Sequence, residues 1–143
     1  MQFLERLKPV SLLLLRCALG LIFMTHGYPK LFTETPRFTQ FFQSLGFAWY
    51  LVYIVGVLEL FGGGMLIAGL ATRAVGLLFT VEMAVAIWKV HLGHGIYAVR
   101  DYEFPLALAV GTFALATVGA GVISLDNFVF PGRARPKPKP SKG

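Results

Sequence analysis

Cysteine is almost absent from this chain of 143 residues, and charged residues are scarce. Its single cysteine, Cys17, excludes an intramolecular disulfide, a CxxC redox pair and a thiolate metal site. Only 14% of the residues are charged and 56% are hydrophobic, whereas a soluble domain carries about 25% charged residues. The length therefore favours one domain, and the composition favours a membrane protein.

Several catalytic and nucleotide-binding motifs are also missing. The sequence contains no Walker loop, no GxGxxG after a strand and no nucleophile elbow, so we expect neither nucleotide binding nor acyl transfer. His26, His91 and His94 come from different segments and form no HxxxH or ExxH pair. We therefore expect no metal site and disfavour a bis-histidine haem.

The formal net charge of +6 is concentrated at the C-terminus, in the stretch GRARPKPKPSKG. A basic segment spaced by prolines cannot bury a core, so we predict that residues 127–143 form a disordered tail. Beside a membrane, each of its basic residues would gain about 1 kcal/mol from anionic head groups. Membrane lipids are thus expected partners, and nucleic acid is not.

Long apolar runs dominate the rest of the chain. A helix needs about 20 mostly apolar residues to span the hydrocarbon, and four windows qualify: 10–31, 50–70, 73–92 and 103–124. We read the first as an uncleaved helix, because Arg16 interrupts the apolar run and no small-x-small cleavage site follows. The predicted fold is an all-α integral membrane four-helix bundle over residues 10–126, preceded by a cytoplasmic N-terminus at 1–9.

Basic residues set the expected orientation. An even number of spans places both termini on one side, together with most of the lysines and arginines: Arg6, Lys8, Arg73, Arg133, Arg135, Lys137, Lys139 and Lys142. Fewer lie toward the other side: Lys30, Arg37, Lys89 and Arg100. Because basic residues favour the cytoplasmic side, we expect both termini to be cytoplasmic.

The first outer loop, TPRFTQFFQSLG, carries a short amphipathic helix of its own. Thr35 can cap this helix, Pro36 can be its first residue, and Gly46 can end it. Its aromatic and aliphatic residues follow the spacing of one helical face: Phe38, Phe41, Phe42 and Leu45. The helix can be an anchor at the membrane interface or a lid over a site beneath it.

Each predicted span has one polar or small face. Because a helix turns by about 100° per residue, the residues of each span can be sorted by the face on which they lie. One face of the first span contains Arg16, Leu19, Gly20, Phe23, His26, Gly27 and Lys30. One face of the second span contains Gly56, Glu59, Gly62, Gly63 and Leu66. The glycines beside Glu59 would let a neighbouring helix approach closely, so Glu59 should face protein. The third span carries Glu82 and Lys89, and the fourth a stripe of Glu103, Ala107, Val110, Ala114, Thr117 and Gly121.

Ionisable residues within spans are costly and should be paired. We expect Lys30 to pair with Glu103 or Asp101, His26 with Glu59, and Arg16 with Glu82. These residues could hold the bundle together. However, the gathering of His26, Lys30, Lys89 and Glu103 toward the outer half favours a polar pocket that opens outward.

Four motifs in order give the sequence a resemblance to the DoxX family of small bacterial inner-membrane proteins. They are HGxxK at 26–30, ExxGG at 59–63, GxxTR at 69–73 and a closing GxGxxSxD. The resemblance covers about residues 11–126. It implies a multi-pass protein of the bacterial inner membrane.

The resemblance also implies a link to redox chemistry. Some family members are described as subunits of a thiosulfate:quinone oxidoreductase, and others as parts of membrane redox assemblies. The residues carried over as the candidate pocket are His26, Lys30, Glu59 and Glu103, with Arg16, Glu82 and Lys89 as supporting polar residues. This chain supplies no cofactor ligands, so the resemblance requires a bound quinone or a redox partner subunit to carry electrons.

In that reading, His26 and Lys30 would hydrogen-bond quinone oxygens, and Glu59 or Glu103 would accept protons. Whether the chain is itself an enzyme stays open at this point. The alternative is a non-enzymatic membrane protein, either an assembly factor or a small-molecule carrier.

Overall fold

The structure is a computed structural model that describes residues 2–91, 99–129 and 131. These residues are helical apart from short connections, and no strand occurs among them. Among the described residues, three helical stretches are long and apolar enough to cross a membrane, and they correspond to the first three predicted spans: Phe3–Thr33, Leu51–Ala68 and Thr72–His91. The all-helical prediction is therefore confirmed, and the apolar helices are of the kind that membrane proteins use.

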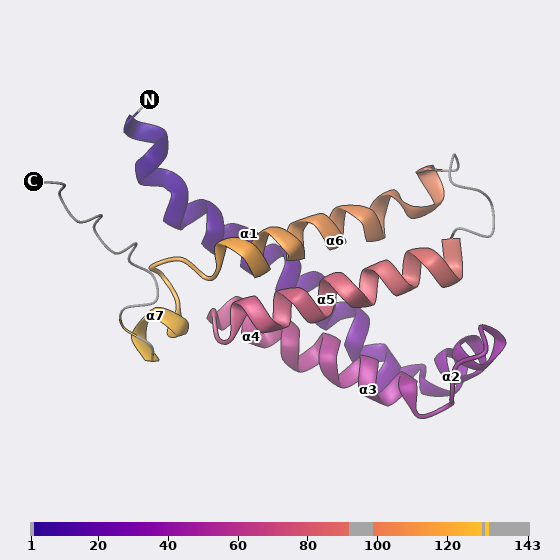
Figure 1. The fold of residues 1–143 in the computed structure, drawn as a ribbon. Helices are drawn as coiled ribbons and strands as arrows, with labels where there is room; N and C mark the ends of the chain where they lie inside the picture. The colour runs from indigo at the N-terminus through magenta and orange to yellow at the C-terminus, as the bar shows by residue number, and fades with distance from the viewer. Residues whose placement is uncertain (1, 92–98, 130, 132–143) are drawn as a thin grey trace, which may run out of the picture.

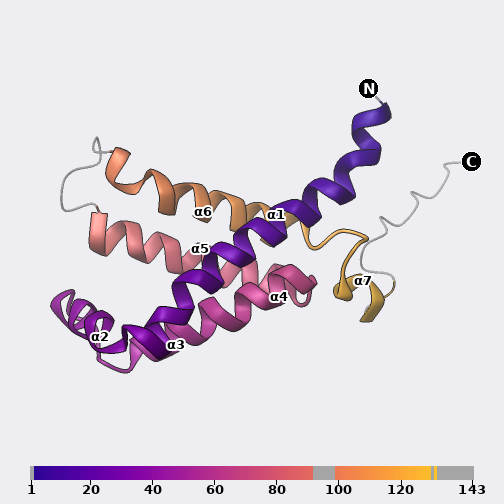
Figure 2. The same ribbon diagram turned by 180° about the vertical axis from the view of Figure 1, so that it is seen from behind.

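The helices and the π-helical segments, labelled η, follow one another closely along the chain (Figure 1). Their bounds are α1 Gln2–Tyr28, η1 Pro29–Thr33, α2 Thr35–Ser44, α3 Leu51–Val57, η2 Leu58–Gly62, α4 Gly63–Ala68, α5 Thr72–Ala86, η3 Ile87–His91, α6 Val99–Val118 and α7 Leu125–Val129. Helix α1 runs diagonally past α4 and α3, and α5 and α6 lie side by side (Figure 2). We call the two ends of the molecule the α2 end and the α7 end.

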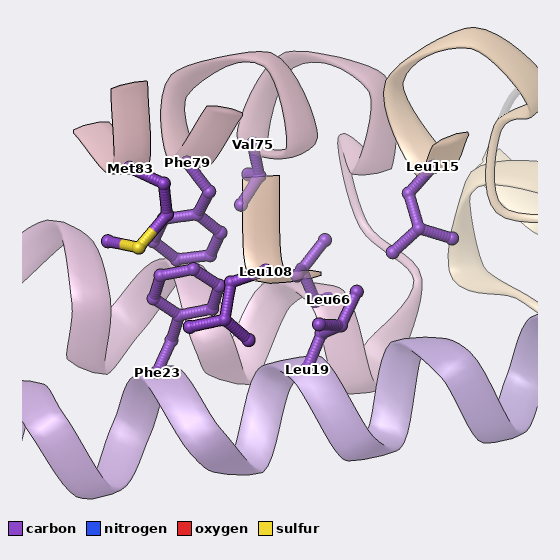
Figure 3. Packing of buried hydrophobic residues seen from close by; sticks show 8 residues of the cluster. All are labelled: Leu19, Phe23, Leu66, Val75, Phe79, Met83, Leu108 and Leu115. Carbon is purple, nitrogen blue, oxygen red and sulfur yellow. The ribbon is translucent and has the colours of Figure 1, made fainter. Parts of the chain in front are cut away.

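The hydrophobic core lies where α1, α4, α5 and α6 meet. Phe23 of α1 stacks in parallel on Phe79 of α5, with 3.7 Å between the ring centroids (Figure 3). The buried aliphatic and sulfur-containing side chains around them are Leu19, Leu66, Val75, Met83, Leu108 and Leu115. Because these residues come from four different helices, the core fixes how the helices are placed against one another.

Glycines allow α1 to approach α3 and α4 closely. A Cβ atom added at Gly63 would lie 2.6 Å from the carbonyl oxygen of Gly20, and one added at Gly27 would lie 2.8 Å from that of Gly56. Such distances mean that the two backbones are in direct contact. The predicted close approach beside Glu59 is thus confirmed, and Glu59 is only 3% exposed.

At the α7 end, a buried arginine holds the chain that follows α6. Arg16 is 1% exposed, and its guanidinium donates hydrogen bonds to the carbonyl oxygens of Ala120 and, at 2.7 Å, Ile123. Gly69 leaves the room for this group, since a Cβ there would lie 2.6 Å from Nη1 of Arg16. Helix α1 is thereby tied to the segment that leads into α7.

Asp126 of α7 completes this arrangement by capping α5. Its carboxylate accepts hydrogen bonds from the backbone N–H of Ala71 at 2.6 Å and of Thr72 at 2.9 Å, and its own N–H donates to Gly69. Ala71 has φ +50°, a costly conformation for a residue with a side chain. We call Arg16, Gly69, Ala71, Thr72 and Asp126 the α7 clamp. It explains why the GxxTR and GxGxxSxD motifs occur together.

Helix α6 differs from the fourth predicted span. It ends at Val118 and not at 124, because Gly119 with φ +92° and Gly121 with φ +78° turn the chain. The small-residue stripe predicted to face the bundle was wrong, as most of it is exposed: Glu103, Ala107, Val110 and Thr117. The buried face consists instead of Leu108, Thr112 and Leu115, and Thr112 shares a 3.0 Å hydroxyl contact with Thr80 of α5.

Helix α2 lies in the loop between the first two apolar stretches. Its N-cap residue is Glu34, so Thr35 lies inside the helix and does not cap it as predicted. The reason is that η1 runs directly into α2, and the N–H of Glu34 donates to the carbonyl of Pro29. Gly46, with φ +83°, follows the helix end at Ser44.

Candidate functional site

Two π-helical segments carry the central residues of the candidate site. Segment η1 begins at Pro29, which has no N–H to donate to the preceding turn and therefore disturbs the α-helical pattern. Lys30 is in η1, and Glu59 is in η2. Single π turns inside α-helices are frequent at functional sites. Their extra residue per turn also changes which face each side chain occupies.

Lys30 and Glu59 form a buried ion pair between these two segments. Nζ of Lys30 donates to Oε2 of Glu59 at 2.5 Å and to the carbonyl oxygen of His26 at 3.3 Å. Lys30 is 8% exposed, and Glu59 less still. Gly27 permits the contact, since a Cβ there would lie 2.8 Å from the Cβ of Glu59. Charge neutralisation makes the burial of both groups tolerable.

A second carboxyl group joins the pair from α5. The side chain of Glu82 is in hydrogen-bonding contact with Glu59 and close enough to Lys30 to feel its charge. Oε2 of Glu82 is buried, and no hydrogen-bond donor of the described chain reaches it. We call Lys30, Glu59 and Glu82 the carboxyl–lysine cluster. It contains two acids and one base.

Aromatic residues near α2 lie over the cationic groups of this end. The ring centroid of Phe38 in α2 is 5.2 Å from Nζ of Lys30, within the range of a cation–π interaction. Nζ of Lys89 in η3 lies 4.7 Å from the ring of Trp88 and 5.8 Å from that of Phe47. Phe38 of α2 therefore covers Lys30, and Phe47 in the loop after α2 lies near Lys89.

His26 lies beside the cluster with its side chain exposed. Its Nδ1 is 2.8 Å from the carbonyl oxygen of Ile22. Because a carbonyl only accepts, Nδ1 carries a hydrogen, and in the neutral ring Nε2 is then an acceptor. Its ring centroid lies 6.0 Å from that of Phe104 in α6. The predicted pairing of His26 with Glu59 was wrong, since Lys30 occupies that carboxylate.

The other two predicted pairings were also wrong. Lys30 meets Glu59 and not Glu103 or Asp101, and Glu103 is exposed on α6. Arg16 binds backbone carbonyls in the α7 clamp, whereas Glu82 meets Glu59. Lys89, predicted as a supporting residue, is exposed beside aromatic rings. The structure thus joins Lys30, Glu59 and Glu82, with His26 adjacent, and leaves Glu103 outside.

Two features of the site were missed from the sequence. The contact between Glu59 and Glu82 was one. Both residues lie near the middle of their predicted spans, 50–70 and 73–92, and this similar depth in the membrane was the available signal. The position of Phe38 over Lys30 was the other. Phe38 was recognised as part of the apolar face of α2, but nothing in the sequence showed what that face covers.

Comparison with known proteins agrees with the motifs. The sequence profile of the DoxX family matches residues 11–92. A Bacillus subtilis protein named "Putative oxidoreductase CatD" is 36% identical over 124 residues, which cover 87% of this chain and 90% of the relative. Two uncharacterized Haemophilus influenzae proteins are 33% and 32% identical and cover 91% and 84% of the chain, or 98% and 83% of the relatives. No solved structure matches the chain significantly. The chain belongs to the DoxX family.

Proposed function

We propose that this protein is a membrane component of a quinone-linked oxidoreductase system, and that the carboxyl–lysine cluster with His26 binds the quinone head group. The observation that carries the proposal is the buried Lys30–Glu59 pair with Glu82 beside it. Ionisable groups within membrane helices are expensive and are kept mainly where they have a function. The name of the Bacillus subtilis relative supports the oxidoreductase class.

The hydrogen-bonding groups of the site fit a quinone. A lysine ammonium has three N–H donors, and Lys30 directs bonds to Glu59 and to the carbonyl of His26. A third N–H can therefore serve a quinone oxygen. Nε2 of His26 is an acceptor that suits the hydroxyl group of the reduced form. The exposed ring of Phe104 near His26 offers a flat apolar surface for the head group.

A bound quinone would carry electron pairs, while electrons enter or leave through a redox partner subunit in the membrane. The residues of this chain would orient the head group and handle its protons. Lys30 would hold one oxygen by a charge-assisted hydrogen bond. Glu59, already in contact with Lys30, would accept the proton that a reduced quinone releases.

The proposal includes a polar pocket that opens at the α2 end, with α2 as its lid. The lid role is supported by Phe38, which packs over Lys30. The exposed polar residues of α2 are Arg37, Gln40, Gln43 and Ser44. Gly46 follows the helix in a left-handed conformation, and a Cβ there would meet nothing within 4 Å. Helix α2 is therefore connected to α3 through a point that other parts of the chain do not crowd.

We further propose that α6 is a fourth span, so that the chain forms a four-helix bundle in the bacterial inner membrane. Its 20 residues extend about 30 Å, which matches the hydrocarbon thickness. The N-terminus of α1 lies on the same side of the molecule as α7 (Figure 1), and the start of α5 is bonded to Asp126 of α7. These two segments carry Arg6, Lys8 and Arg73, which favour a cytoplasmic position for the α7 end. A green fluorescent protein fused after residue 143 should fluoresce, and alkaline phosphatase fused there should be inactive. The reverse pattern would contradict this orientation.

The quinone proposal is tested by extraction. The full chain is purified in mild detergent from quinone-containing membranes, and the quinone per protein is measured by mass spectrometry. Lys30→Met and Glu59→Gln should each lower this ratio at least about tenfold, which corresponds to 1.4 kcal/mol of binding free energy. A Glu34→Gln/Arg37→Gln variant is the matched control, because it removes an exposed ion pair at the same end.

Circular dichroism and gel filtration check that each variant is folded. A wild-type protein without quinone, or a Lys30→Met variant that retains it, would overturn the proposal. The absence of quinone together with recovery of the same membrane partner from wild type and variants would favour the assembly-factor alternative.

A further inference from the structure

We infer that Glu59 and Glu82 share one proton, carried by Glu82 while Glu59 is paired with Lys30, so that the carboxyl–lysine cluster is a proton-binding site among the membrane helices. This inference deepens the proposed function. Only the role of the proton in quinone chemistry rests on that function. The presence of the proton can be measured without any quinone.

The charge count of the cluster is the first argument. Lys30 contributes one positive charge, and Glu59 and Glu82 would contribute two negative charges if both were ionised. Within the part of the chain that the structure describes, the charged groups that interact with Glu82 are Lys30 from η1 and Glu59 from η2. An uncompensated charge at such a buried position is strongly unfavourable. One bound proton makes the cluster neutral.

The contact between the carboxyl groups is the second argument. Two carboxylates can only accept hydrogen bonds, so they repel each other, whereas a carboxylic acid can donate to a carboxylate. Glu59 and Glu82 are in hydrogen-bonding contact. Oε2 of Glu82 is buried and meets no donor of the described chain. A proton on Glu82 turns the repulsion into a hydrogen bond, and it makes Oε2 part of a neutral group, whose burial without a donor costs less than that of a carboxylate.

The positions of the two acids determine where the proton lies. Oε2 of Glu59 accepts a charge-assisted hydrogen bond from Lys30, which stabilises its ionised form. Glu82 has no such direct bond to a cation in the described chain. The resting arrangement is therefore an ammonium, a carboxylate and a carboxylic acid in a row across η1, η2 and α5.

This row can pass a proton without changing its total charge. Transfer along the hydrogen bond converts the acid of Glu82 and the carboxylate of Glu59 into the carboxylate of Glu82 and the acid of Glu59. No bond other than the O–H bonds is broken or formed, and no electron moves. Glu82 is thus a positioning residue that sets the proton content of Glu59, the group closest to Lys30.

Infrared spectroscopy of the purified full chain in detergent tests the inference. At neutral pH, a carbonyl band of a protonated carboxylic acid should be present and should shift in deuterated water. Glu82→Gln should abolish this band. Glu59→Gln should also abolish it, because Glu82 would then ionise as the counter-ion of Lys30. Lys30→Met should raise the band about twofold, because both acids then lack a counter-ion and stay neutral.

The matched control is Glu103→Gln, which removes an exposed carboxyl group and should leave the band unchanged. The absence of the band in the wild-type protein at neutral pH would overturn the inference, and so would its persistence in Glu82→Gln. The wild-type spectrum alone is decisive if a variant fails to fold. Protein from quinone-deficient cells should give the same band, so failure of the quinone proposal and failure of this inference are distinguishable.

Discussion

Two buried cations lie on the first helical stretch, and the molecule accommodates them in opposite ways. Arg16 at the α7 end donates to the backbone carbonyls of Ala120 and Ile123. Lys30 toward the α2 end donates to the carboxylate of Glu59. Both residues are almost completely buried. The difference lies in the acceptors.

The acceptor decides what each site can do. A backbone carbonyl does not bind a proton at ordinary pH, so the hydrogen bonds of Arg16 can only be made or broken as the chain folds. A carboxylate can become an acid, and Glu59 has a second acid, Glu82, beside it. The α7 clamp is therefore suited to holding the helices together, and the carboxyl–lysine cluster to chemistry. Substitutions at the two ends should separate stability from function.

The largest loss of stability is expected for Arg16→Met. The substitution leaves two buried carbonyl oxygens without donors, which should lower the free energy of unfolding by about 3–5 kcal/mol. Quinone binding at the α2 end should survive in the protein that remains folded. Denaturant titration in detergent measures the first effect and quinone extraction the second, with the exposed Arg6→Met as the control. An unchanged unfolding free energy would show that the clamp is not structural.

The next largest effect is expected for Glu59→Gln, which removes the carboxylate that is hydrogen-bonded to Lys30 and leaves Glu82 to compensate the charge from a less direct position. We expect a loss of roughly 3 kcal/mol in the free energy of unfolding. The double variant Lys30→Met/Glu59→Leu should recover stability to within about 1 kcal/mol of wild type, because apolar pairs often replace buried ion pairs without cost. It should still bind no quinone. A double variant as unstable as Glu59→Gln would contradict this account of the pair.

The sequence predicted the face of most of α1 correctly but not the partners of its polar residues. Arg16, Leu19, Phe23 and Lys30 are buried as expected, whereas His26 is exposed. A regular α-helix turns by a constant angle of about 100° per residue. The π-helical segments at η1 and η2 break that regularity, so Lys30 turns toward Glu59 while His26 does not.

The partner of Arg16 was missed for a different reason. The prediction paired Arg16 with the carboxylate of Glu82, but backbone carbonyls that are free at the end of a helix also accept hydrogen bonds from a buried cation. Gly119 and Gly121 turn the chain after α6 and expose such carbonyls to Arg16.

The outward face of α6 was also mispredicted, because small residues mark close helix contacts only where a neighbour is present. The contact of α6 with α5 uses Thr112 next to Gly76 instead.

A smaller effect is expected at the crossing of α1 and α4, which lies between the two ends. Gly63→Ala should lower the free energy of unfolding by about 1–3 kcal/mol through overpacking, because its Cβ would meet the backbone of Gly20 at 2.6 Å. Gly64→Ala is the matched control, since a Cβ there meets nothing within 4 Å. The control should be neutral or stabilising by up to about 1 kcal/mol. Equal effects of the two variants would argue against the close crossing.

The smallest effect is expected for Asp126→Ala, which removes the cap of α5 and leaves Arg16 in place. The N–H groups of Ala71 and Thr72 would lose their acceptor, at a cost of about 1–2 kcal/mol. The effect should be smaller than that of Arg16→Met, because Asp126 is only partly buried and water can replace it. Denaturant titration measures the loss, with Glu5→Ala as an exposed control. If Asp126→Ala were as damaging as Arg16→Met, the capping carboxylate and the arginine would act as one unit, and the α7 clamp would depend on a charge pair more than on backbone carbonyls.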